Sequence, residues 1–199
     1  SYIKPHWPYM APDPYHKMYS KDDILPPIRC DEEIKTRHFV VDAYAKHEES
    51  INFSKDACRE RVIPSYMGLI SELDANIGRL IKFLENEGKI DDTIIVLTSD
   101  HGDYLGDHWL GEKELFYESA IRIPMIIIDP GHEASPTRGT SIDEFVESID
   151  LIPTFLEMAG SPHNHDHILE GRSLLPLLHS NLKHSWRDAT FCEMDYCIR

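Results

Sequence analysis

A carboxylate and an imidazole stand next to each other at Asp100 and His101, directly after a short apolar run. Carboxylate oxygens and imidazole nitrogens both bind divalent cations, and Gly102 allows the backbone to turn tightly beside them. A lysine, Lys113, follows at the end of a loop that contains two further glycines. In an open α/β sheet the functional crevice lies at the carboxyl ends of the strands, so this loop is the first candidate site. An isolated Asp-His pair has a simpler interpretation as a turn cap beside an ordinary polar histidine.

A second group of imidazoles occurs at His163, His165 and His167. On a strand, this alternation would place all three side chains on one face, as a zinc or nickel site requires. The proline, asparagine and aspartate around and between them favour a surface loop instead. We therefore leave the role of these histidines open.

The elements that must position the Asp-His pair are a helix and two short strands. Between residues 61 and 87, apolar side chains recur every three or four positions and Gly88 follows as a stop, which predicts a helix. Residues 93–98 form a β-branched apolar run that predicts a strand buried on both faces, and residues 124–128 form a second such run. The alternation of helix and buried strand predicts an α/β fold.

The remaining segments are less regular. Six prolines within residues 1–30 predict a loop, because proline removes backbone donors. Asp150 and a following proline open a short helix that we expect to run through Met158, before Gly160. Residues 161–172 read as a polar loop, and residues 186–196 are a candidate for one more strand. We find no internal repeat and no low-complexity linker.

Several of these segments together carry a family resemblance. The string TSDHGDYLGDHWLGEK at residues 98–113 resembles the sulfatase and phosphonate monoester hydrolase branch of the alkaline phosphatase superfamily. Further resemblances follow the family's order and extend the match over nearly the whole chain; they lie at residues 4–19, 66–80, 122–131, 149–160 and 170–178. The resemblance implies a central mixed, mostly parallel sheet flanked by helices, of which this chain is a middle-to-C-terminal piece. His101 stands where many sulfatases have Asn, which brings the chain closer to the phosphonate monoester hydrolases.

The same resemblance implies roles for four residues. Asp100 and His101 would be metal ligands, and Lys113 and His6 would donate to the non-bridging oxygens of a sulfuryl or phosphoryl group. His6 has an alternative role, protonating the leaving-group oxygen. The expected cofactor is one divalent metal ion, either Mn, Zn or Ca, because an imidazole among oxygen ligands tolerates Mn²⁺ and Zn²⁺ readily.

The family's nucleophile lies in a Cys/Ser-x-Pro-x-Arg motif near the start of the parent domain, where the Cys or Ser can be converted to formylglycine. The segment from Ala134 to Arg138 imitates this pattern with Ala at the nucleophile position, but it follows the metal pair instead of preceding it. We interpret it as a coincidence. The resemblance thus implies that the nucleophile is not in this chain and that residues 1–199 form a partial sulfatase-like catalytic domain, inactive by itself.

Composition restricts the partners. The 199 residues are 41% hydrophobic, enough for one sizeable core, and carry a net charge of -15, which disfavours nucleic acid and anionic membranes. The longest apolar stretch, residues 123–128, is far shorter than the roughly 20 residues of a membrane-spanning helix. Four cysteines without tight metal spacing favour a reduced, cytoplasmic setting. A small anionic ester remains compatible as substrate, because a metal ion and local cations reverse the potential inside a pocket.

Two function hypotheses follow. The first is a metal-dependent hydrolase of sulfate esters or of phosphonate and phosphate esters. The second is a non-catalytic binding or assembly module that retains the sulfatase fold. In either case, a sheet without its early strands has an exposed edge, so we expect the isolated chain to form homo-oligomers.

Overall fold

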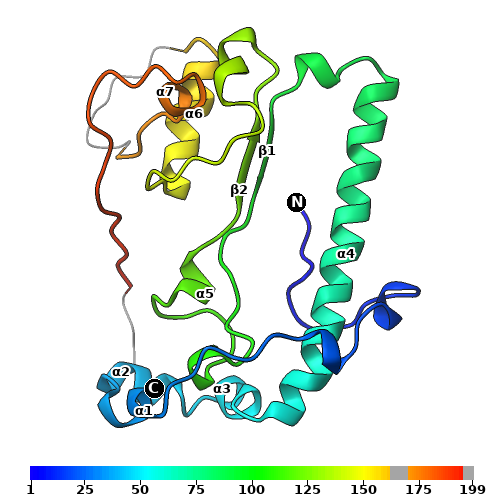
Figure 1. Cartoon of the computed structure of the whole chain (residues 1–199), viewed down its shortest axis with the longest axis vertical. Helices are drawn as coiled ribbons and strands as arrows, with labels where there is room; N and C mark the ends of the chain where they lie inside the picture. The colour runs from blue at the N-terminus through cyan, green and yellow to red at the C-terminus, as the bar shows by residue number, and fades with distance from the viewer. Residues whose placement is uncertain (162–169, 195–199) are drawn as a thin grey trace. The chain divides into compact units, whose positions relative to one another are not determined.

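The computed structural model describes residues 1–161 and 170–194, and its contacts divide the chain into two compact units. Unit 1 contains the described residues 1–90, 101–123 and 194, and unit 2 contains the described residues 91–100, 124–161 and 170–193. Figure 1 shows the path of the chain through the elements of both. The predicted three-histidine group at residues 163–167 lies outside the described residues.

Unit 1 begins with an irregular segment that contains two 3-10 turns, η1 (Tyr15–Lys17) and η2 (Lys21–Asp23). The predicted loop over residues 1–30 is thus confirmed. Three short helices follow, α1 (Asp31–Thr36), α2 (Phe39–Tyr44) and α3 (Glu48–Phe53).

The long helix α4 (Asp56–Asn86) confirms the helix predicted from the apolar periodicity, although it begins five residues earlier. It ends before Gly88, whose φ of +62° is the left-handed conformation that a glycine stop supplies. The N-terminal segment packs along this helix, as Figure 1 shows for the blue and cyan ribbons. Gly68 permits the close approach, because a Cβ there would lie 2.5 Å from the carbonyl oxygen of Tyr15.

The chain returns to unit 1 at residue 101 and forms η4 (Asp107–Trp109) and α5 (Glu118–Ile121). The core of this unit consists of Tyr44, Tyr104, Leu110 and Ala120, all nearly inaccessible to solvent. Two of these residues come from the loop that leads to Lys113. The loop is therefore part of the hydrophobic core and is held by it.

Unit 2 contains two strands among its described residues, β1 (Ile95–Thr98) and β2 (Met125–Ile128). They pair antiparallel, with Ile95 opposite Ile128 and Thr98 opposite Met125. Short 3-10 and α-helical segments complete the unit; they are η5 (His132–Thr137), η6 (Ser148–Asp150), α6 (Leu151–Met158) and α7 (Leu175–Leu178). Another turn, η3 (Ile90–Asp92), spans the boundary between the units.

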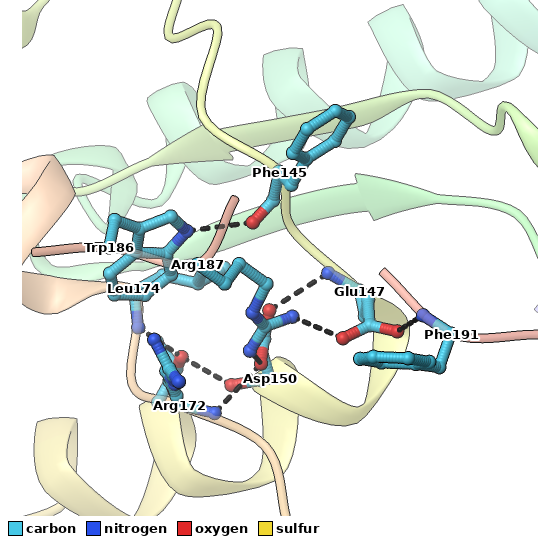
Figure 2. A network of polar contacts seen from close by, with 9 residues as sticks. Phe145, Glu147, Asp150, Arg172, Leu174, Trp186, Arg187 and Phe191 are labelled. Atoms are coloured by element: carbon cyan, nitrogen blue, oxygen red, sulfur yellow. Dashed lines mark hydrogen bonds and ion pairs between the residues drawn. The ribbon is translucent and has the colours of Figure 1, made fainter. Parts of the chain in front are cut away.

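A buried carboxylate organises part of unit 2. Asp150 is fully buried and accepts hydrogen bonds from the backbone N–H groups of Glu147 and Arg172, at 2.8 and 2.7 Å, and from Nη2 of Arg187 at 2.6 Å (Figure 2). Trp186 next to it donates from Nε1 to the carbonyl of Phe145. The helix predicted to open at Asp150 and to reach Met158 is confirmed.

Two predictions about strands are wrong. Both strands were expected to be buried on both faces, but β1 is half-buried and β2 exposes alternate side chains, with Ile126 53% and Ile128 47% accessible. An apolar run is buried on both faces only where other elements cover both faces of the strand. In β2 the described residues cover one face and leave the other exposed. The candidate strand at 186–196 is absent from its described part, residues 186–194, where Trp186 and Arg187 instead contact the segment around Asp150.

Among the described residues, no helix combines the length and the apolar composition that crossing a membrane requires.

Candidate functional site

Unit 1 brings together two of the residues predicted from the sequence. Nζ of Lys113 lies 3.3 Å from Nε2 of His6, although the two are 107 positions apart in the chain. Nδ1 of His6 lies 2.9 Å from the carbonyl oxygen of Trp7. Because a carbonyl only accepts, Nδ1 carries the proton, and the lone pair of Nε2 accepts from the Lys113 ammonium. The pair is a cation beside a neutral imidazole.

The segment that carries His6 is fixed at several points. Nζ of Lys4 donates to the carbonyl oxygens of His6 and Pro8, at 3.0 and 2.6 Å. Ser65 on α4 donates to the carbonyl of Tyr9 at 2.8 Å. These bonds close a compact turn around His6 and attach it to the long helix, so the imidazole has a defined position.

Tyr9 joins this turn directly to the loop that carries Lys113. Its hydroxyl donates to Oδ2 of Asp103 at 2.6 Å, and Oδ1 of Asp103 accepts the backbone N–H of Leu105 at 3.1 Å. Burial raises the pKa of Tyr9, and the neighbouring carboxylate raises that pKa further, so the tyrosine keeps its proton. Burial also raises the pKa of Asp103, against the lowering effect of the bond from Tyr9. No sequence feature indicates this bond between Tyr9 and Asp103, although Asp103 lies inside the string at residues 98–113.

Lys113 has a second partner in Glu112, whose Oε2 lies 3.3 Å from its Nζ. Both side chains are only partly exposed, at 22% for Glu112 and 29% for Lys113. The ammonium is thus held between a carboxylate and an imidazole and remains within reach of solvent. Such an arrangement presents a positive charge to an incoming anion.

Glycines allow the loop to approach its surroundings closely. A Cβ at Gly102 would lie 2.0 Å from the carbonyl oxygen of Ser119, and one at Gly111 would lie 2.8 Å from that of Glu49. Backbone contacts this short exclude any side chain. Gly102, predicted to allow a tight turn, thus has a packing role as well.

The predicted metal ligands, Asp100 and His101, are consecutive in the chain. Asp100 is the last residue before the boundary in unit 2, where it is exposed and accepts from Oγ of Ser99 at 3.3 Å; His101 is the first residue of the returning segment of unit 1. Nδ1 of His101 lies 2.7 Å from the carbonyl oxygen of Gly102, and because a carbonyl only accepts, Nδ1 donates in this contact. A backbone carbonyl commonly fixes a metal-binding histidine in this way.

The donor chemistry of Asp100 and His101 therefore fits a divalent cation. Two donors are fewer than the four to eight that such ions take in proteins. Within the described part of the chain, no group of three or more His, Cys, Asp or Glu side chains is arranged to hold a metal ion. The remaining ligands would have to come from other groups.

Two other sequence features have structural roles. Arg138, which ends the imitation of the nucleophile motif, donates from Nη2 to the carbonyls of Pro130 and Gly131, at 2.6 and 2.8 Å. His108, within the string at residues 98–113, lies with Nδ1 2.6 Å from Oε1 of Glu33 and stacks on the ring of Tyr117. Both residues stabilise turns.

Comparison with known proteins finds a matching family model, similar proteins and similar solved structures. The Sulfatase family model matches residues 1–161. The chain is 35% identical over 207 residues to the multifunctional alkaline phosphatase superfamily protein PehA of Trinickia caryophylli, covering 98% of this chain and 40% of that protein. It is 33% identical over 200 residues to an arylsulfatase of Clostridium perfringens, covering 94% and 38%. The solved phosphonate monoester hydrolase of Silicibacter pomeroyi superposes with a TM-score of 0.82 at 34% identity, over 94% of this chain and 38% of that one. The chain thus spans about two fifths of the length of the relatives it matches.

Proposed function

This chain belongs to the sulfatase family of the alkaline phosphatase superfamily, and on that premise we propose that the intact protein is a metal-dependent hydrolase of sulfate esters or of phosphonate and phosphate esters. The expected α/β fold of that superfamily is confirmed by the similarity to solved phosphonate monoester hydrolases. The observation that carries the proposal is the Lys113–His6 pair, which presents a cation and an imidazole together.

Lys113 would bind the anionic group of the ester. Sulfuryl and phosphoryl transfer pass through transition states in which negative charge spreads over the equatorial oxygens, so fixed cations stabilise them. The Lys113 ammonium can donate three hydrogen bonds; one goes to Nε2 of His6, and Oε2 of Glu112 lies 3.3 Å away as an ion-pair partner. A substrate oxygen can accept one of the remaining hydrogens or replace His6.

His6 would act at Nε2, the atom that faces Lys113. In the neutral form this nitrogen has only a lone pair, so His6 needs a second proton to donate to a non-bridging oxygen or to a leaving group. The Nδ1–H bond to Trp7 holds the ring orientation in both forms. Both predicted roles of His6, donation to a non-bridging oxygen and protonation of the leaving group, therefore require the protonated imidazolium form of the side chain.

Asp100 and His101 would hold the divalent cation, whose identity among Mn, Zn and Ca stays open. When bound, such an ion stabilises negative charge on the reacting ester. The contact of His101 Nδ1 with the carbonyl of Gly102 supports this proposal, because a backbone carbonyl commonly orients a metal-binding histidine in this way.

The 199 residues by themselves would not turn over substrate, because the family's Cys/Ser-x-Pro-x-Arg motif does not precede the metal pair in this sequence. We further propose a small anionic ester substrate, a cytoplasmic setting and self-association. The exposed isoleucines of β2 support self-association, since an uncovered apolar strand face favours pairing.

The test is an activity screen of the intact protein on 4-nitrophenyl sulfate, 4-nitrophenyl phenylphosphonate and bis(4-nitrophenyl) phosphate, each with Mn²⁺, Zn²⁺ or Ca²⁺. Lys113→Ala should lower kcat/KM about 10²- to 10³-fold, as removal of a single oxyanion donor does. Lys183→Ala, at an exposed lysine of unit 2, is the matched control and should retain full activity. Absence of metal-dependent turnover on all three substrates would favour the non-catalytic module.

A further inference from the structure

The loop between Asp103 and Lys113 has an unusual backbone. Leu105, His108, Trp109 and Glu112 all have positive φ angles, of 46°, 54°, 58° and 63°. Residues other than glycine seldom adopt this conformation, and it persists where the surroundings impose it. The contacts that impose this left-handed conformation therefore also affect the position of Lys113, which ends the loop.

Three guanidinium groups bind the carbonyl oxygens of this loop. The donors come from the N-terminal segment, from the residue after α1 and from α4; they are Arg29 Nε to Gly106 at 2.8 Å, Arg37 Nη2 to His108 at 2.6 Å, and Arg59 Nε to Leu105 at 3.1 Å. Three carbonyls within four consecutive residues are thus each held by an arginine.

The arginines are themselves anchored. Arg29 also donates from Nη2 to the carbonyl of Phe53 at 2.9 Å and from Nη1 to Asp56 at 3.0 Å. Arg59 donates from Nη2 to the carbonyl of Leu25 at 3.2 Å. Their side chains are only 12% and 6% exposed. The guanidinium fork suits such multiple, fixed bonds, whereas a lysine ammonium is a single point charge.

The ring of Trp109 adds a contact to two of these groups. The guanidinium carbons of Arg29 and Arg37 both lie 5.5 Å from its centroid, within the range of a cation–π interaction. The left-handed Trp109 is therefore fixed through its side chain as well as through the neighbouring carbonyls.

We call Arg29, Arg37 and Arg59 the arginine clamp. The loop residues whose carbonyls they bind determine where Lys113 leaves the loop. The N–H of Gly106 donates to the carbonyl of Leu110 at 2.9 Å, and the N–H of Tyr104 donates to the carbonyl of Glu112 at 2.8 Å. The loop is thus closed on itself, so a shift of residues 105–109 would shift Glu112 and Lys113.

We propose that Arg29, Arg37 and Arg59 are positioning residues for the reaction: they hold the left-handed loop so that the Lys113 ammonium meets His6 and the substrate anion. The inference rests on the proposed function, because it assigns the clamp an effect on Lys113. Their guanidiniums act through backbone carbonyls and do not contact the substrate.

The test is a double-mutant cycle in the intact protein, with the substrate that the activity screen identifies. Arg29→Gln should lower kcat roughly tenfold while KM stays within about twofold, and in the Lys113→Ala background it should lower kcat less than about twofold. Arg61→Gln, at an exposed arginine two residues beyond Arg59 on α4, is the matched control and should change neither value. Equal losses from Arg29→Gln in both backgrounds would mean that the arginine only supports folding, and would overturn the inference.

A spectroscopic measurement decides the inference without turnover. In the ¹⁵N spectrum of the intact protein, Lys113→Ala should shift the Nε2 resonance of His6, because it removes the donor to that atom. Arg37→Gln, at an arginine less buried than Arg59, should shift the same resonance in the same direction. An unchanged resonance in a folded Arg37→Gln protein would reject the clamp. If Lys113→Ala leaves both the resonance and the activity unchanged, the proposed function fails instead.

Discussion

The polar cluster of Lys113 in unit 1 and that of Asp150 in unit 2 satisfy their charges differently. Asp150 is fully buried and accepts bonds from two backbone amides and one guanidinium (Figure 2). Lys113 is partly exposed and has an imidazole and a carboxylate as partners at 3.3 Å. A closed network stabilises a fold, while an accessible cation with long bonds can exchange a partner for a substrate.

The difference predicts that Asp150 controls stability and Lys113 controls activity. Asp150→Ala should lower the free energy of unfolding by about 3–5 kcal/mol, because it removes the acceptor of the Glu147 and Arg172 N–H groups and one of the two carboxylates that bind the buried Arg187 guanidinium, the other being Glu147. Thermal and urea unfolding of the intact protein measure this loss. Asp143→Ala, at an exposed carboxylate of the same unit, should change stability by less than about 0.5 kcal/mol. A similar loss in the two variants would contradict the comparison.

Tyr9 and Tyr19 allow a sharper comparison within unit 1. Each hydroxyl forms one hydrogen bond of nearly equal length, Tyr9 to Asp103 at 2.6 Å and Tyr19 to Ser71 at 2.7 Å, but only the first reaches the loop of Lys113. Each Tyr→Phe change should lower the free energy of unfolding by about 1 kcal/mol. Tyr9→Phe should also lower kcat roughly tenfold, whereas Tyr19→Phe should leave kcat within about twofold. Equal kcat values in the two variants would show that the tether does not position Lys113 or His6.

The sequence predicts the local elements well and their surroundings poorly. The helix from Asp56 to Asn86 and the strands ending at Thr98 and Ile128 could be predicted because apolar period and glycine stops are local signals. Burial of the strands could not, because it depends on elements that cover the sheet. Within the site, His6 and Lys113 followed from the family's motifs, and the structure brings them together. The three arginines were missed because carbonyl acceptors and left-handed φ angles leave no residue-type signal in a single sequence. The Tyr9–Asp103 bond was missed because only the fold brings together two residues 94 positions apart.

The smallest expected effect concerns an ion pair of unit 2, between Oδ2 of Asp129 and Nε2 of His179 at 2.9 Å. Burial alone would raise the pKa of Asp129, but the bonds from His179 and from the N–H of Gly131 outweigh burial and lower that pKa. A carboxyl with a lowered folded pKa contributes stability that is present above its usual value of about 3.9 and is lost as the pH falls through the folded value. Asp129→Asn should therefore lower stability slightly near neutral pH and flatten the loss of stability below about pH 4. Urea unfolding between pH 3 and pH 7 measures how the free energy of unfolding changes with pH in the original protein and in Asp129→Asn. Equal pH dependence in the two proteins would mean that the Asp129–His179 pair makes no net contribution.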